Sequence, residues 1–97
     1  MNIRSHSLQG VLVLEPSGDL TATSGALELR RAAAAGSKVV INMAGIDHMD
    51  SSGLGELVRV AAGRSVKLCN VPSRLRSIIS ATRLAVFSDE RSAAGSF

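Results

Sequence analysis

Residues 38–62 read KVVINMAGIDHMDSSGLGELVRVAA, and this stretch decides the fold. Its first six residues, 38–43, are rich in β-branched apolar side chains, which is typical of a strand buried on both faces. The helical period returns after Asp50, with apolar residues at Leu54, Leu57, Val58 and Ala61. We expect residues 44–49 to form a short loop, so residues 50–53 would lie at a strand-to-helix junction.

The sequence before this stretch predicts a hairpin and a helix. Residues 1–20 alternate and then become apolar, which indicates two strands joined by a turn at Gln9 and Gly10. Residues 21–35 change to a helical period and predict an amphipathic helix of about four turns that ends at Gly36. The apolar positions of this helix are Ala22, Ala26, Leu29 and Ala33.

The sequence after this stretch continues the alternation of strand and helix. Residues 65–71 predict a strand, and Pro72 begins a helix. Residues 84–87 predict a short strand, and residues 88–91 predict the capped start of a final helix. The expected order is therefore ββαβαβαβα. It predicts one α/β domain over residues 1–97, with a mixed, mostly parallel sheet and helices packed on it.

The composition argues against several classes of function. The chain has 97 residues, a net charge of +3 and 45% hydrophobic residues, which is typical of a folded globular domain. A small excess of positive charge and only two aromatic residues, Phe87 and Phe97, argue against nucleic-acid binding. The single cysteine cannot form an internal disulfide, and no apolar run is long enough for a signal peptide or a membrane helix. We therefore expect a cytoplasmic protein without direct membrane insertion.

The most informative motif is DSSGLG at residues 50–55. Two hydroxyls and two glycines at a helix N-terminus leave backbone N–H groups unpaired and uncovered by bulky side chains, so an anion is favoured there. A phosphoryl group on one of these serines would add about two negative charges beside Asp50 and would change any surface docked over this end. The motif predicts a phosphorylation switch that acts on a partner. Helix capping is the alternative, because Asp and Ser are preferred N-caps, and the two roles can coexist.

This motif and its surroundings resemble the STAS domains, and within them the bacterial anti-sigma factor antagonists. The resemblance covers nearly the whole chain: a hairpin that ends in SGDL at residues 17–20, a buried strand at 39–42, the DSSGLG motif, and VPS at residues 71–73 opening a helix. It implies that Ser51 is phosphorylated by a partner that is both an anti-sigma factor and a serine kinase of the histidine-kinase-like ATPase type. The unphosphorylated protein would bind this partner and free the sigma factor, and the phosphorylated protein would release the partner. A Ser/Thr phosphatase would reset Ser51.

The resemblance also implies which residues contact the partner. Ser51 carries the switch, Ser52 is the reserve candidate, and Asp50 supports or orients the modified side chain. Gly53 and Gly55 are expected to keep the helix end open. The expected partner-binding residues are Asp19, Thr21, Met49, Asp50, Ser51, Ser52, Gly53, Leu54 and Gly55.

Two other functions stay open under the same resemblance. STAS domains also serve as accessory subunits of lipid-transport ABC ATPases, where no sigma factor is involved. A partner-switching regulator of a non-sigma output would carry the same serine switch with a different client. Thr21 stands where many antagonists carry a further acidic residue, so the contacts with the partner at that loop are expected to differ.

Catalysis, cofactors and metals are not expected on this chain, which would serve as a substrate and a binding module. A hydrolase triad of His48, Asp50 and Ser51 is disfavoured, because neighbours in one loop rarely converge in space. His6, His48 and Asp47 match no familiar spacing of metal ligands.

Two further features have simple structural interpretations. Cys69 lies within a predicted strand and is expected to be a small buried apolar residue. Five arginines occur on or near the second and third predicted helices. They form a solvated helix face or, alternatively, meet acidic groups on a partner. These arginines are Arg59, Arg64, Arg74, Arg76 and Arg83.

Overall fold

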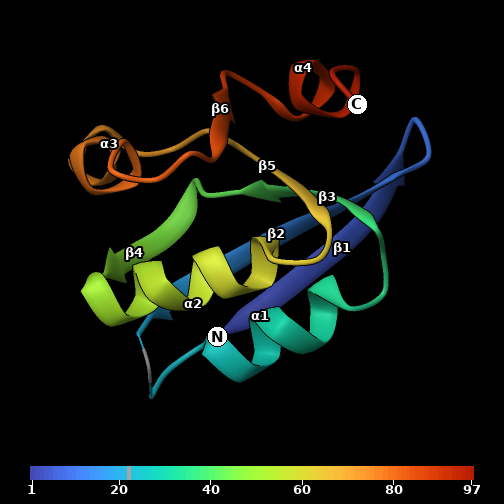
Figure 1. Ribbon diagram of the computed structural model, residues 1–97. Helices are drawn as coiled ribbons and strands as arrows, with labels where there is room; N and C mark the ends of the chain where they lie inside the picture. Colours follow the sequence, from blue (N-terminus) through green and yellow to red (C-terminus); the bar gives the residue numbers. More distant parts are fainter. Residues whose placement is uncertain (22) are drawn as a thin grey trace.

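The structure, a computed structural model, describes residues 1–21 and 23–97. This part of the chain forms a small α/β domain around one six-stranded sheet (Figure 1). The strands are β1 (Asn2–Leu8), β2 (Val11–Leu20), β3 (Lys38–Asn42), β4 (Gly45–Met49), β5 (Ser65–Cys69) and β6 (Ala85–Phe87). The helices are α1 (Ala26–Ala33), α2 (Ser51–Ala61), α3 (Ser73–Ile79) and α4 (Glu90–Ala94).

The sheet is mixed and mostly parallel, as the sequence predicts. Its strand order is β1-β2-β3-β5-β6, with β4 paired to the second half of β2. Only β1 and β2 pair antiparallel among the described strands, and their turn is the predicted one. Gln9 and Gly10 both have positive φ, at 55° and 77°, which is the backbone twist that a two-residue hairpin turn requires.

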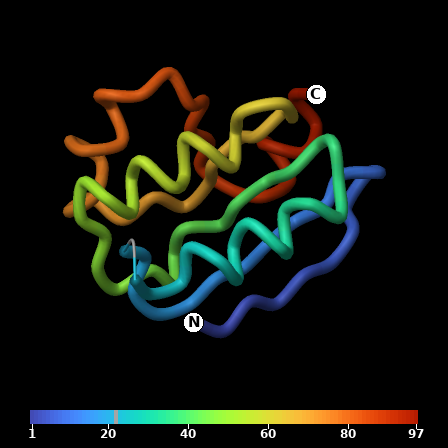
Figure 2. Tube along the Cα trace, turned by 60° about the horizontal axis from the view of Figure 1, so that its bottom comes forward, coloured from blue at the N-terminus to red at the C-terminus, as the bar shows by residue number. Residues whose placement is uncertain are grey.

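The alternation of side chains in β2 divides the core between the two faces of the sheet. Leu14 points to the larger cluster, which contains buried side chains of α1, α2 and α3. Val11 and Val13 point to a smaller cluster that includes Ala93 and Ala94 of α4. Figure 1 shows α1 and α2 on one side of the sheet and α4 on the other, and Figure 2 shows α1 and α2 running side by side. Side chains alternate along a strand, so β2 places apolar residues on both faces of the sheet, and helices cover each face.

The prediction of a helix over residues 21–35 is wrong at its start, since α1 begins only after Gly25. Thr21 instead opens a turn, in which its N–H donates to the Ser24 carbonyl at 2.8 Å. Gly25 has a φ of +83°, and a side chain there would also meet the backbone oxygen of Asp19 in β2. This position therefore requires glycine, and α1 begins directly after it. Ala22, predicted as part of this helix, lies outside the described residues.

The prediction of a loop over residues 44–49 is also wrong, because residues 45–49 form β4. This strand pairs in parallel with the end of β2, where a register shift falls between Gly18 and Asp19. Only Ile46 of β4 is fully buried, which explains why its sequence carries no clear strand pattern. The observed order is therefore ββαββαβαβα, with one strand more than expected.

Candidate functional site

The junction between β4 and α2 is built as a capped helix start. Asp50 has extended backbone angles, and its Oδ1 accepts a hydrogen bond from the Gly53 N–H at 2.7 Å. Its carbonyl accepts the first helical hydrogen bond, from the Leu54 N–H at 2.9 Å. The predicted strand-to-helix junction and the capping role of Asp50 are confirmed.

The two serines of the motif lie in the first turn of α2, directly after the cap. Ser51 and Ser52 are both exposed. Within residues 1–21 and 23–97, neither hydroxyl has a hydrogen-bond partner. The Asp50 side chain caps one backbone N–H of this turn, that of Gly53. The helix dipole adds positive potential at the same end. Chemically, the arrangement presents two accessible hydroxyls at a position that tolerates a phosphoryl group.

The two glycines of the motif differ in their surroundings. Gly53 is buried, and a Cβ at this position would overlap the carbonyl group of Leu20. The expectation that Gly53 keeps the helix end open is therefore wrong: this glycine lets α2 approach the last residue of β2. Gly55 is exposed with open space around it, as expected.

The ends of β2 and β4 bring the other predicted contact residues beside this helix start. Asp19 and His48 face each other in the pairing of the two strands, and the Asp19 Oδ1 lies 3.1 Å from the His48 Nδ1. Leu20 and Met49 are the next pair, and Met49 packs at the edge of the larger core. Thr21 follows directly and is half-buried. The structure thus gathers all the predicted contact residues at one end of the sheet. Their role in binding a partner stays a prediction.

The two histidines of the disfavoured sets lie beside carboxylates that the sequence did not connect with them. The imidazole of His48 contacts Asp19. His6 lies with Glu15 and Glu90 instead of with His48 and Asp47. Sequence reasoning missed this second grouping, because its three members come from β1, β2 and α4 and no local pattern connects them.

Cys69 is fully buried, as expected for a small apolar residue in a strand. Burial, together with the nearby carboxylates of Glu90, Asp89 and Glu15, raises the pKa of its thiol to about 12. A thiol with this pKa stays protonated near neutral pH, so it offers neither a nucleophile nor a thiolate ligand.

Arginines on or near α2 and α3 make contacts within the chain, which supports a structural role for them. Arg59 pairs with Glu56 at 3.2 Å, and Arg64 donates to the Val60 carbonyl at 2.9 Å. Arg76 donates to the Val71 carbonyl at 3.4 Å.

Arg74 is the residue of this group with a role that the sequence did not suggest. From α3, its guanidinium donates to the carbonyls of Ile46 and Asp47 in β4. These hydrogen bonds join α3 to the backbone of the strand that β2 pairs with. Arg74 therefore fixes the strand that leads into Asp50.

None of the helices in the described part of the chain is long and apolar enough to cross a membrane.

Comparisons with known proteins identify the family and the fold of the chain. The model of the STAS domain family matches residues 2–93. A search of curated protein sequences found no match. Among solved structures, the anti-sigma factor antagonist SpoIIAA in its unphosphorylated form matches with a TM-score of 0.70 and 17% identity, over 98% of this chain and 96% of that one. The phosphorylated form, from Bacillus, matches with the same TM-score and 16% identity, over 98% of this chain and 97% of that one.

Two further solved structures share the fold. A candidate anti-sigma factor antagonist from Thermotoga maritima matches with a TM-score of 0.80 and 16% identity, over 97% of this chain and 92% of that one. The murine anion transporter Solute Carrier 26 family member A9 matches with a TM-score of 0.74 and 18% identity, over 97% of this chain but only 19% of the transporter. At these identities the likeness shows the fold alone.

Proposed function

The chain belongs to the STAS domain family, and we propose that it is an anti-sigma factor antagonist whose binding to an anti-sigma factor is switched by phosphorylation of Ser51. The observation that carries this proposal is the exposed Ser51 hydroxyl in the first turn of α2, directly after the Asp50 cap. The similar fold of SpoIIAA, known in unphosphorylated and phosphorylated forms, supports it.

The switch acts by charge at a docking surface. Unphosphorylated Ser51 leaves a small hydroxyl beside Asp50, at the same end of the sheet as the exposed pair of Asp19 and His48. This surface binds the anti-sigma factor and so frees the sigma factor. Phosphorylation adds about two negative charges next to the Asp50 carboxylate, and a partner fitted to the neutral hydroxyl is released.

The chemistry of the switch belongs to the partners. The anti-sigma factor is also a serine kinase of the histidine-kinase-like ATPase type, which supplies the ATP and the magnesium. A metal-dependent Ser/Thr phosphatase removes the phosphoryl group. In this proposal the chain is a cytoplasmic substrate and binding module, and the kinase and phosphatase supply the catalysis.

Ser51 is preferred over Ser52 as the modified residue on the basis of the family resemblance. Both hydroxyls are exposed, so accessibility does not separate them. Ser52 is the reserve candidate, and its hydroxyl can alternatively donate a hydrogen bond to a phosphoryl group on Ser51.

A role in a transporter is the second candidate function. The same fold in an anion transporter is the observation that favours it. In this case the domain would be an accessory subunit of a lipid-transport ABC ATPase. A partner-switching regulator of a non-sigma output is the third candidate, and it would share the Ser51 switch.

A capture experiment with matched variants tests the proposal. Wild type, Ser51→Ala, Ser51→Asp and the control Ser52→Ala serve as baits in lysate of the native organism, and mass spectrometry identifies the captured chains. We expect wild type, Ser51→Ala and Ser52→Ala to capture a histidine-kinase-like ATPase and Ser51→Asp to lose it. The purified ATPase with ATP should then phosphorylate wild type and Ser52→Ala but not Ser51→Ala.

The variants are chosen so that loss of folding cannot imitate the switch. An acidic residue in the first turn of a helix is favourable to the dipole, so Ser51→Asp should fold, which circular dichroism checks. Equal capture of the ATPase by Ser51→Ala and Ser51→Asp would refute the switch. Capture of a transporter ATPase by all four baits would support the accessory-subunit function instead.

A further inference from the structure

We infer that His6, Glu15 and Glu90 form a binding site for a first-row divalent cation, with Zn²⁺ the best match, on the face of the sheet that α4 covers. The three side chains come from β1, β2 and α4, and one ligand atom from each lies within 4.8 Å of the others. His6 Nε2 is 3.0 Å from Glu90 Oε1, and His6 Nδ1 is 3.8 Å from Glu15 Oε2. This site is independent of Ser51 and of the proposed switch.

The strand register explains why these side chains meet. His6 lies opposite Val13, and Glu15 is two residues further along β2, so both point to the face on which α4 packs. Glu90 is the first residue of α4. This helix follows β6, the strand at the opposite edge of the sheet from β1. Residues far apart in the sequence therefore converge from three separate elements.

The donor set decides the class of cation. One imidazole nitrogen and two carboxylate oxygens suit Zn²⁺ and its first-row neighbours, whereas Mg²⁺ and Ca²⁺ prefer oxygen ligands alone. Donors about 2.0–2.2 Å from Zn²⁺ lie about 3.3–3.6 Å apart at tetrahedral angles. His6 meets the two carboxylates with different ring nitrogens, and only one of them can bind a given ion. One donor atom from each residue lies within 4.8 Å of the other two, so rotation of the exposed His6 side chain and of the glutamates would bring the three donors closer together onto one ion. Water would complete the coordination.

A neighbouring amide orients one of the carboxylates. Asn42 Nδ2 donates to Glu90 Oε2 at 2.7 Å, which leaves Glu90 Oε1 facing His6. The Asn42 side chain is itself fixed, since its Oδ1 accepts from the Ala44 N–H at 3.0 Å. Outer hydrogen bonds of this kind hold metal ligands in place in known sites.

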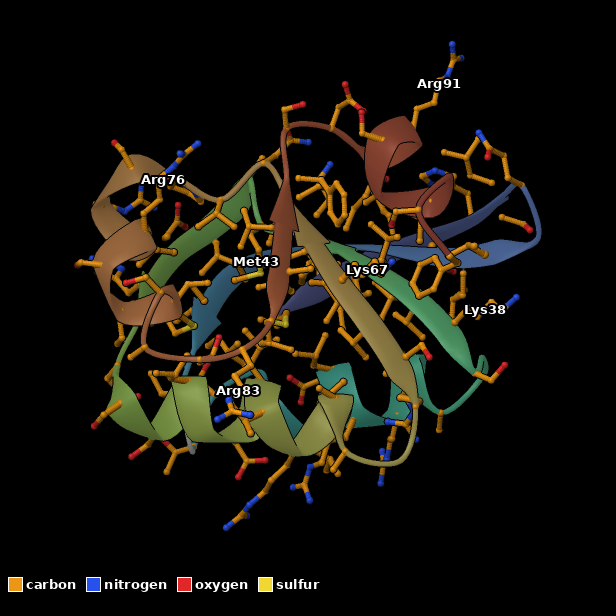
Figure 3. All side chains as sticks on the ribbon, turned by 45° about the horizontal axis from the view of Figure 1, so that its top comes forward. Lys38, Met43, Lys67, Arg76, Arg83 and Arg91 are labelled. Carbon is orange, nitrogen blue, oxygen red and sulfur yellow. The ribbon has the colours of Figure 1, made fainter. Side chains whose placement is uncertain are left out.

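The charge balance also favours a cation. Two carboxylates face His6, and among the described residues Arg4 is the only lysine or arginine that pairs with either of them, at 3.8 Å from Glu15. The Arg4 side chain is 86% exposed, so it is free to move aside. Arg91, the next residue after Glu90, points from α4 into solvent (Figure 3).

A cation at this site would fasten α4 to the hairpin. The core under α4 is small, with Ala93 and Ala94 as its own buried side chains, and the helix has only five residues. Lys67 of β5 already tethers the chain end, where its Nζ donates to the Ser96 carbonyl at 2.9 Å. A bound ion would add a link at the opposite end of the same helix.

Zn²⁺ titration of untagged protein by calorimetry tests the site, with melting temperature as a second measurement. The variants are His6→Gln and Glu90→Gln, and His48→Gln is the matched control because it removes the other histidine. We expect one Zn²⁺ per wild-type chain and a melting temperature that rises with Zn²⁺ concentration. His48→Gln should bind unchanged, while His6→Gln and Glu90→Gln should bind about tenfold more weakly or worse.

Two results would overturn the inference. The first is saturable Zn²⁺ binding that His6→Gln leaves intact, since the ion would then lie elsewhere. The second is no saturable binding by wild type, in which case the three side chains form only an ion-pair cluster that holds α4. Neither result bears on Ser51, whose capture experiment uses no added metal.

Discussion

The close approach of α2 to the end of β2 can be tested by adding one methyl group at Gly53. In most helices the change from glycine to alanine stabilises the protein, by about 1 kcal/mol, because alanine loses less backbone entropy on folding. At Gly53 the new Cβ would overlap the carbonyl group of Leu20. The sign of the effect therefore depends on whether these backbone atoms can move.

The structure indicates that they cannot move cheaply. Leu20 is fully buried and is paired with Met49 in the sheet, so its carbonyl is fixed by the core on one side and by β4 on the other. Overpacking of this kind costs about 1–3 kcal/mol and more when backbone has to shift. After the gain in helix propensity, we expect Gly53→Ala to lower the free energy of unfolding by about 2 kcal/mol. For a chain of this length the melting temperature should fall by about 8–16 °C.

Gly55→Ala is the matched control, two residues further along the same helix. Nothing lies within 4 Å of a Cβ built on Gly55, so only the helix propensity changes. We expect this variant to be more stable than wild type by about 0.5–1 kcal/mol. Urea denaturation followed by circular dichroism measures both values. A Gly53→Ala variant as stable as Gly55→Ala would refute the argument, because the two sites would then differ in nothing but position.

Three further predictions concern other parts of the fold. Arg74→Ala removes the hydrogen bonds to the β4 carbonyls and should lower the free energy of unfolding by about 1–2 kcal/mol, with faster hydrogen exchange in β4. Unchanged exchange would contradict the role of Arg74 in holding β4. Cys69, buried and with a pKa raised to about 12, should resist iodoacetamide at pH 8 in the native protein and react in urea. Asp89 accepts a hydrogen bond from the Ser92 backbone N–H, which lowers its pKa below 3.8. Its capping of α4 should therefore be present above the ordinary pKa of an aspartate and be lost as the pH falls through the lowered pKa. NMR of α4 can follow this loss, and Asp89→Asn should not show it.

The parts of the fold that the sequence predicts are those with a local signal. The apolar run of β3 and the helical period after Asp50 each need only neighbouring residues to be recognised. The same holds for the cap, because the spacing from Asp50 to Gly53 is itself the geometry of an N-cap.

The parts that it does not predict depend on contacts between distant residues. β4 has a single buried side chain, Ile46, and becomes a strand through its pairing with β2. The start of α1 depends on Gly25, whose backbone lies against Asp19. The packing of Gly53 on Leu20 joins residues 33 positions apart, so the glycine looks like an open position until the fold is known.

The first turn of α2 both packs against the sheet and presents Ser51 to solvent, and these two roles lie on different faces of the helix. Ser51 and Gly53 are two residues apart, which on a helix places them on different faces. One face is packed: Gly53 contacts the end of β2, and Asp50 holds its N–H. The other face presents the Ser51 hydroxyl to solvent. A phosphoryl group on Ser51 would thus change the charge of the surface while the packing that fixes the helix stays in place, and a switch of this kind needs no refolding of the domain that carries it.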